Sequence, residues 1–175
     1  MRDLSLELDL SFHAAPDNTL KFFKDPLIHS LLTNSKTWEE VLFNWLSIIR
    51  NDDALKCPEI VRNASLISMG LQFTDDTTIA QMNSIWRKKE EHTDVLSFPI
   101  LDQLTPLPAT DYVELGDIIV SVTTANRQAL EMKHELGIEL RWLVSHGLLH
   151  LLGWDHPDQR TLDEMLAFQK DLIAY

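Results

Sequence analysis

The sequence predicts an α+β fold in which a mixed four-stranded sheet is packed with helices, mainly on one face. Short segments with strand-like apolar patterns are interspersed with segments of helical period, and this mixture is the first observation behind the prediction. The second is an ordinary globular composition, with 45% hydrophobic and 24% charged residues. The length of 175 residues suits one domain over residues 1–175 and is short for two.

Four segments have the pattern of β-strands. Residues 4–10 alternate strictly between apolar and polar side chains, which predicts a half-buried strand. Residues 66–73 and 95–100 are apolar-rich segments of strand length, and 116–121 is a continuous apolar run typical of a buried strand. A proline-containing loop at 105–108 is expected to end the third of these strands.

Two helices are predicted in the first half of the chain. Residues 38–50 carry apolar side chains at helical period, behind a Thr37 cap with Glu40 three residues on. This helix is expected to pack on the sheet, with its tryptophans in the core. A shorter helix is expected at 77–86, whereas 14–37 gives no clear pattern beyond some helical content.

Three further helices are predicted in the C-terminal part. Thr123 or Thr124 can cap a helix that runs toward Leu136, where a glycine interrupts it. Helices are then expected at 138–152 and, as a terminal amphipathic helix, at 162–173.

The most informative segment contains three of the seven histidines. His146 and His150 are four residues apart, so on a helix their imidazoles share one face. Gly153 can end that helix in the left-handed conformation, and the chain then returns His156 toward the same point. Three imidazoles leave one position of a tetrahedral zinc ion open, which is the arrangement of a catalytic site. The sequence therefore predicts one Zn²⁺ per chain and hydrolytic chemistry.

The residue after the first of these histidines is a glycine, Gly147. The metalloprotease signature H-E-x-x-H-x-x-G-x-x-H has the same spacing, but its second residue is the glutamate that acts as general base. Glycine cannot move a proton. Either the base comes from elsewhere in the chain, or the chemistry is not peptide hydrolysis.

The run His146–His156 reads H-G-L-L-H-L-L-G-W-D-H and resembles the signature H-G-x-L-H-L-x-G-x-D-H of the YbeY family of metal-dependent endoribonucleases. Two upstream segments are similar to further motifs of that family. They are T-D-V-L-S-F-P at Thr93–Pro99, preceded by Arg87, and L-G-D-I at Leu115–Ile118. The three motifs occur in the family's order, which makes them more specific together than singly.

The resemblance covers the chain from about Leu66 to the C-terminus and leaves a longer N-terminal region, at about 14–58, poorly matched. It implies a zincin-like fold and a single-strand-specific endoribonuclease. That enzyme would act in 16S rRNA 3′-end maturation and ribosome quality control, with ribosomal RNA and the small ribosomal subunit as partners. It also supports a catalytic Arg87, whose guanidinium would clamp a phosphate and stabilise charge that develops at phosphorus.

Two other functions stay open on the residues alone. A zinc-dependent protease or amide hydrolase is favoured by the histidine spacing and disfavoured by Gly147. A non-enzymatic ribosome assembly factor with a structural metal is favoured by the acidic composition and the missing in-helix base. Three imidazoles also suit nickel, copper or cobalt, so zinc is not the only candidate metal.

Other polar residues have less specific interpretations. Asp155 either orients a ligand or water as a second catalytic residue, or caps its turn. Asp117 either supports a ligand histidine or caps a strand edge, and Ser97 at most contacts substrate. Four histidines lack metal spacing and are expected at the surface or in packing roles: His13, His29, His92 and His134.

The chain carries a formal net charge of −12, which disfavours a general RNA-binding surface. A local basic groove remains possible, with Arg87–Lys89, Arg127 and Lys133 as candidates. The single cysteine, Cys57, excludes a disulfide and a cysteine-rich zinc site within one chain. No signal peptide or membrane span is recognisable, so a cytoplasmic protein without membrane contact is expected.

Overall fold

The computed structural model describes residues 5–101 and 111–174. Within them a four-stranded sheet has the order β1-β2-β4-β3. β1 (Glu7–His13), β2 (Leu66–Thr74) and β4 (Tyr112–Ser121) run parallel, and β3 (Val95–Pro99) pairs antiparallel to β4 at one edge. The predicted α+β fold with a mixed four-stranded sheet is therefore confirmed.

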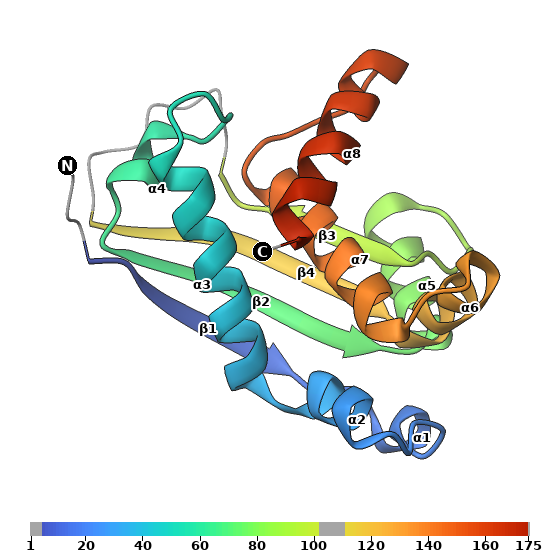
Figure 1. The fold of residues 1–175 in the computed structure, drawn as a ribbon. Coiled ribbons are helices and arrows are strands. Elements are labelled where there is room, and N and C mark those ends of the chain that lie inside the picture. Colours follow the sequence, from blue (N-terminus) through green and yellow to red (C-terminus); the bar gives the residue numbers. More distant parts are fainter. Residues whose placement is uncertain (1–4, 102–110, 175) are drawn as a thin grey trace.

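Helices connect the strands and supply the second layer of the fold. α1 and α2 lie beyond the end of β1, α3 crosses the front of the sheet, and α7 lies beside α3 with α8 packed on its outer side (Figure 1). Eight helices occur in the described residues: α1 (Asp17–Leu20), α2 (Pro26–Thr33), α3 (Ser35–Asn51), α4 (Glu59–Asn63), α5 (Asp76–Arg87), α6 (Val122–Met132), α7 (Leu136–Leu151) and α8 (Gln159–Ile173).

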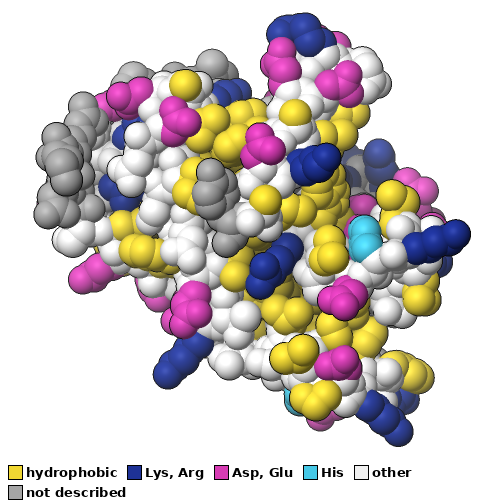
Figure 2. Space-filling view, in the orientation of Figure 1, with side chains coloured by type: hydrophobic (Ala, Val, Ile, Leu, Met, Phe, Trp, Pro, Cys, Tyr) yellow, Lys and Arg dark blue, Asp and Glu magenta, His cyan; other side chains and the backbone are white. Residues whose placement is uncertain are grey.

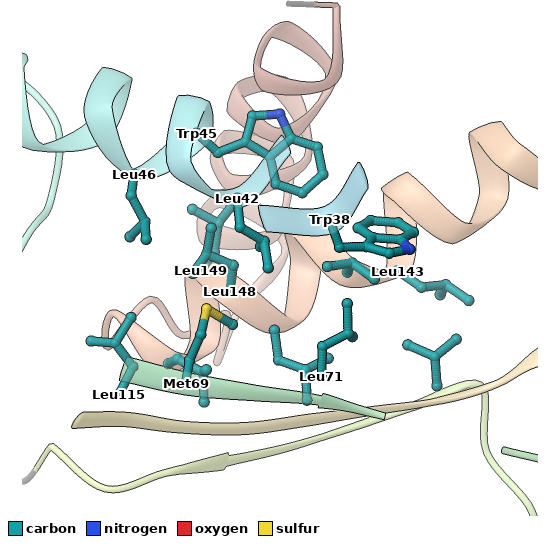
Figure 3. Packing of buried hydrophobic residues seen from close by; sticks show 14 of the residues in the cluster. Trp38, Leu42, Trp45, Leu46, Met69, Leu71, Leu115, Leu143, Leu148 and Leu149 are labelled. Carbon is teal, nitrogen blue, oxygen red and sulfur yellow. The ribbon is translucent and has the colours of Figure 1, made fainter. Parts of the chain in front are cut away.

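The main core lies between the sheet and the layer formed by α3 and α7. Figure 3 shows Trp38 and Leu42 of α3 directed toward Met69 and Leu71 of β2, with Leu148 of α7 beside them. All five side chains are buried. The expectation that the first amphipathic helix packs on the sheet, with its tryptophans in the core, is confirmed.

The opposite face of the sheet is covered only in part, by α5. Ile79 of this helix packs against Leu96 and Ile119, with Met82 and Phe98 around them. Because neighbouring strand residues point to opposite faces, Ile119 faces α5 while Ile118 faces α7. β3 is thus an edge strand with one side toward α7 and the other toward α5.

Several helix starts differ from the predicted ones. α3 begins after Asn34, whose side chain accepts from the Lys36 N–H, so the expected Thr37 cap is wrong. α6 is capped by Ser121, which accepts from the Thr124 N–H, and neither Thr123 nor Thr124 is the cap. Each region offers several residues able to cap, and the direction in which the preceding segment enters decides which one does.

The ends of other elements also shift. α6 stops at Met132 because Lys133 adopts the left-handed conformation, with φ 57. α7 begins at Leu136 instead of 138, so Gly137 lies in its first turn and does not interrupt a helix. α8 begins at 159, three residues before the predicted start, behind a capping box formed by Asp158 and Thr161.

Two strands have other bounds than the predicted ones. β1 begins at Glu7, where its pairing with Leu66 of β2 begins, and it continues to His13. β4 begins at Tyr112, four residues before the predicted start, and contains a bulge before Asp117. Gly116 has φ 116 there, and a Cβ would lie 2.0 Å from the Phe98 carbonyl oxygen, so only glycine fits. The loop predicted at 105–108 lies outside the described residues.

Candidate metal centre

α7 directs two imidazoles to one point. The Nε2 atoms of His146 and His150 lie 3.1 Å apart, one helical turn from each other. His156, from the turn after α7, brings its ring centroid within 5.5 Å of His146 and 5.1 Å of His150. One ring nitrogen from each of the three histidines lies within 4.8 Å of the others. In the described part of the chain this is the only group of three or more such side chains able to hold a metal.

The turn that returns His156 is built as predicted around Gly153. This residue has φ 83, its N–H bonds to the His150 carbonyl at 2.9 Å, and the Trp154 N–H bonds to the Leu149 carbonyl at 2.9 Å. This pattern is a Schellman motif, which needs a residue in the left-handed region. The predicted helix end is therefore confirmed, although the helix itself stops at Leu151.

The turn is also attached to the rest of the fold. Trp154 stacks on Phe168 of α8 with ring centroids 5.3 Å apart, and its Nε1 donates to the Lys56 carbonyl at 2.8 Å. The Lys56 ammonium in turn donates to the Gly153 carbonyl. Contacts with α8 and with the segment before α4 thus hold the turn, and with it the third histidine.

A buried amide fixes the first imidazole. Gln169 of α8 is fully buried, and its Nε2 donates to the Trp142 carbonyl at 2.6 Å. Its Oε1 must therefore face His146, whose Nδ1 lies 3.1 Å away and donates to it. In the same way, the Nδ1 of His150 donates to the Trp154 carbonyl at 2.9 Å. Both neutral rings then present an unprotonated Nε2 to the shared point.

This donor set fits a metal ion. Two unprotonated nitrogens 3.1 Å apart cannot hydrogen-bond to each other, so their lone pairs need a cation between them. With Zn–N bonds of about 2.0–2.1 Å, two nitrogens of a tetrahedral site lie about 3.3 Å apart. His146, His150 and His156 are placed to hold such an ion with little rearrangement.

Burial keeps two of these histidines in the neutral form that a metal ion requires. Desolvation lowers the pKa of His146, and the nearby His156 adds to this, while Gln169 and Asp94 oppose it. Desolvation also lowers the pKa of His150, to which the neighbouring His146 contributes. At neutral pH both imidazoles are therefore neutral and free to coordinate.

Gly147 has a packing role that explains the missing glutamate. A Cβ at this position would lie 2.8 Å from the Cγ2 of Ile118, a fully buried residue of β4. α7 approaches the sheet this closely only because residue 147 has no side chain. A glutamate in the place of the metalloprotease base would collide with the sheet.

The structure does not bring Arg87 into contact with the histidines. It is the last residue of α5, on the sheet face opposite α7, and its guanidinium is exposed. Of the other cations suggested for a basic groove, Arg127 lies 3.6 Å from the Asp76 carboxylate and Lys133 is exposed at the end of α6. Figure 2 shows acidic and basic side chains scattered over the α3–α7 face, with hydrophobic ones gathered in the hollow beside α8.

Two aspartates considered from the sequence have contrasting places. Asp155 is exposed next to the histidines, and its Oδ1 accepts the His156 N–H at 2.8 Å, which is the turn-capping interaction. Asp117 lies on the face away from α7, where its Oδ1 occupies the space beside Gly70. Its suggested support of a ligand histidine is therefore wrong, because its neighbour Ile118 takes the inward direction.

Two residues near the histidines were not identified from the sequence. Gln169 occupies an inward position of α8 between Met165 and Leu172. A polar residue on the apolar face of this amphipathic helix is the sequence feature that could have pointed to it. Asp94 precedes β3, where it accepts from the Val95 N–H at 2.7 Å and from Gln128 at 3.0 Å. It lies within the T-D-V-L-S-F-P segment, and its charge acts on His146. Ser97 lies on the α7 side of the same strand, opposite Ile118.

The remaining histidines and the cysteine have ordinary environments. His13 and His29 are exposed, and His92 is exposed with its Nδ1 3.4 Å from Thr124 Oγ1. His134 bonds to the buried Glu139 at 2.5 Å. Burial raises the pKa of Cys57 to about 11, so its thiol stays protonated and unreactive at neutral pH.

These features define a class: an α+β protein in which a helix and the turn that follows bring together three imidazoles able to hold a metal ion. Comparison with known proteins identifies the family. The chain belongs to the YbeY family, whose model, described as "Endoribonuclease YbeY", matches residues 31–175. The match begins inside the 14–58 region and includes all three motifs.

Relatives with this name align with nearly the whole chain. One from Prochlorococcus marinus (strain MIT 9313) is 53% identical over 171 residues, which cover 98% of this chain and 91% of the relative. Another, from Synechococcus sp. (strain CC9902), is 51% identical over 168 residues, which cover 96% of this chain and 91% of the relative. The fold is similar to the solution structure of TM1509 from Thermotoga maritima, with a TM-score of 0.55, 19% identity, and coverage of 95% and 87%. None of the described helices is long and apolar enough to cross a membrane.

Proposed function

We propose that this protein is a zinc-dependent, single-strand-specific endoribonuclease that acts in 16S rRNA 3′-end maturation and ribosome quality control. The observation that carries the proposal is the convergence of His146, His150 and His156 with unprotonated nitrogens, in a chain of the YbeY family. The relatives' name, Endoribonuclease YbeY, supports RNA as substrate and hydrolysis as the reaction. We place the reaction in the cytoplasm, on ribosomal RNA of the small subunit.

Three protein ligands are the set expected of catalytic zinc, since structural zinc is usually closed by four. His146, His150 and His156 would hold the zinc ion, which would supply Lewis-acid chemistry by lowering the pKa of a water molecule or polarising a phosphoryl oxygen. The chain itself supplies fixed ligand orientation, through Gln169 and the Trp154 carbonyl. Such carbonyl and amide partners hold ligand rings and raise their basicity.

Arg87 is proposed to bind the phosphate. Its side chain is exposed and makes no ion pair within the described residues, so the guanidinium is available to a ligand. A bidentate bond to a phosphate stabilises negative charge that increases in the transition state. Since α5 packs against β3 and β3 is the edge strand beside α7, we propose that the RNA strand passes this edge between Arg87 and the histidines.

Asp155 is proposed to assist the site through its turn. Its Oδ1 accepts the His156 N–H, and this bond orients the third proposed ligand. Gly147 disfavours peptide hydrolysis by the route that uses an in-helix glutamate, since no side chain fits there.

The proposal is tested by incubating zinc-loaded protein with a single-stranded RNA, a duplex RNA and an unstructured peptide. We expect cleavage of the single-stranded RNA alone. His150→Ala should lose both metal and cleavage, whereas Arg87→Ala should keep the metal and lose cleavage. His29→Ala, at an exposed histidine outside the site, is the control and should behave as wild type.

Other outcomes identify the alternatives. Peptide cleavage without RNA cleavage would point to the amide hydrolase. Unfolding on chelation, with neither substrate cleaved, would point to an assembly factor with a structural metal. Elemental analysis of the purified protein tests zinc against nickel, copper and cobalt. Incubation with small subunits that carry unprocessed 16S rRNA tests the maturation role, through the length of the 3′ end.

A further inference from the structure

The C-terminal end of α5 carries an exposed aromatic side chain next to three cations. Ile85 and Trp86 are each 70% exposed, and Arg87, Lys88 and Lys89 follow them directly. The two apolar side chains thus lie side by side at the surface, directly before the cations. The chain has a net charge of −12, whereas these three consecutive cations form a locally basic segment.

The indole has a fixed support. Its ring packs edge-on against Phe98 of β3, with centroids 6.0 Å apart and planes at 65°. Phe98 belongs to the small cluster that joins α5 to the sheet, with Ile79 and Leu96. Trp86 is therefore held at one edge while most of its surface stays open to solvent, as a stacking platform requires.

The cations are held by a folded turn. Lys88 has φ 56, its N–H bonds to the Ser84 carbonyl at 3.1 Å, and the buried Asn83 donates from Nδ2 to the Glu91 carbonyl at 2.9 Å. This turn reverses the chain directly after the helix. It keeps the three basic side chains near Trp86 instead of letting them spread along an extended segment.

Glu90 and Glu91 follow these basic side chains in sequence, yet no carboxylate of the described residues forms an ion pair with Arg87, Lys88 or Lys89. Elsewhere basic side chains do have such partners, as Arg160 has in Glu164 at 2.7 Å. An exposed indole beside unpaired cations matches the chemistry of single-stranded nucleic acid, which presents base faces and phosphates in alternation.

The patch formed by Ile85, Trp86 and the cations 87–89 lies beside β3, the edge strand next to α7. Phe98 and Trp86 are on the α5 side of β3, whereas Val95 and Ser97 face α7, the helix that carries His146. Because β3 is the edge strand, no further strand lies between this patch and the sheet face on which α7 carries the histidines.

We infer that Trp86 stacks on a base of single-stranded RNA, next to the nucleotide whose phosphate Arg87 binds. This inference rests on the proposed endoribonuclease function and adds to it a base-stacking subsite outside the metal centre. Stacking is tolerant of sequence, because every base has a π-face. The subsite therefore favours unpaired over duplex RNA without selecting a base.

The test measures the dissociation constant of metal-free protein for a fluorescent single-stranded oligoribonucleotide. Trp86→Ala should weaken binding roughly 5- to 150-fold, the range of one lost base–aromatic stack. Trp86→Phe should keep most of the affinity. With an oligomer of the same length that carries abasic residues, wild type and Trp86→Ala should bind equally, whereas Arg87→Ala should still bind more weakly than wild type.

Phe22→Ala is the matched control. Phe22 is 73% exposed and has a cation beside its ring, the Lys21 ammonium 5.0 Å from the centroid, but it lies near α1, away from β3. Its replacement should leave binding unchanged. An equal loss in Phe22→Ala and Trp86→Ala would overturn the subsite, because any exposed aromatic would then serve.

The remaining outcomes are also decisive. Wild-type affinity in Trp86→Ala, or an equal penalty on the abasic oligomer, overturns the inference even if wild type cleaves RNA. Binding that depends on Trp86 without cleavage by the zinc-loaded protein keeps the subsite and refutes the proposed enzyme. Absence of RNA binding by wild type overturns the inference and leaves a protein partner as the reason for the exposed residues.

Discussion

Gln169 is predicted to control metal affinity without touching the metal. Its amide joins α8 to α7 through two hydrogen bonds, donating to the Trp142 carbonyl at 2.6 Å and accepting from His146 Nδ1 at 3.1 Å. Gln169→Met keeps the length and approximate volume of the side chain and removes both bonds. The buried Nδ1–H of His146 is then left without an acceptor.

The magnitude follows from these bonds. Loss of the acceptor frees the ring to rotate and lowers its basicity, which for such partners typically costs 10- to 100-fold in metal affinity, or about 1.4–2.7 kcal/mol. Leaving a buried donor unsatisfied adds about 1–3 kcal/mol to the loss of folding stability in the metal-free protein. We therefore expect weaker zinc binding together with a lower urea midpoint.

A competition titration of metal-free protein against a chromophoric zinc chelator measures the affinity without any substrate. Gln81→Met, at an exposed position of α5, is the control for the substitution itself and should titrate as wild type. Wild-type zinc affinity in a folded Gln169→Met protein would refute the reasoning, because the ring would then be held without the amide.

Three further outcomes are expected. Gly147→Ala places a methyl group against the sheet at 2.8 Å, so it should destabilise the protein by about 1–3 kcal/mol in urea unfolding and weaken zinc binding; an unchanged midpoint would show that α7 can move away freely. The lowered pKa values of His146 and His150 mean that, below the unfolded value of about 6.5, the unfolded chain takes up protons before the folded one. Metal-free protein should thus be most stable above about pH 6.5 and lose stability as the pH falls toward the folded pKa values. Replacing both histidines with glutamine should reduce that loss. An identical pH profile in the double variant would contradict the lowered pKa values of these two histidines. Asp155→Asn should retain zinc affinity and activity if the residue acts by capping, and Asp155→Ala should weaken both; loss of activity in the asparagine variant with zinc retained would instead assign a role to the charge.

Local features of the site could be predicted because they depend on local geometry. The four-residue spacing of His146 and His150 fixes their common face once the segment is helical, whatever surrounds it. Gly153 ends the helix because few other residues adopt its φ of 83 readily. The alternation over 4–10 and the apolar run at 116–121 likewise predicted strands, although neither pattern showed where strand pairing would begin.

Element boundaries were predicted less well because adjacent residues compete for them. Asn34 caps α3 although Thr37 has the same capacity, and Ser121 caps α6 although Thr123 and Thr124 follow it. The differences in intrinsic preference among these residues are small, about a few tenths of a kcal/mol to 1 kcal/mol. The packing of the preceding strand or loop is enough to decide among them.

The sequence by itself determined that this chain carries a helix with two imidazoles on one face at metal-ligand spacing, a glycine turn and a third histidine, within an α+β fold. Only the tertiary structure decided what surrounds them. Gln169 meets His146 across 23 positions of sequence, Gly147 is required by Ile118 of a separate strand, and the bulge before Asp117 turns that carboxylate away from the site. Spacing along one helix is set by bonds within it, whereas contacts between elements depend on how the layers pack together, which no local pattern encodes.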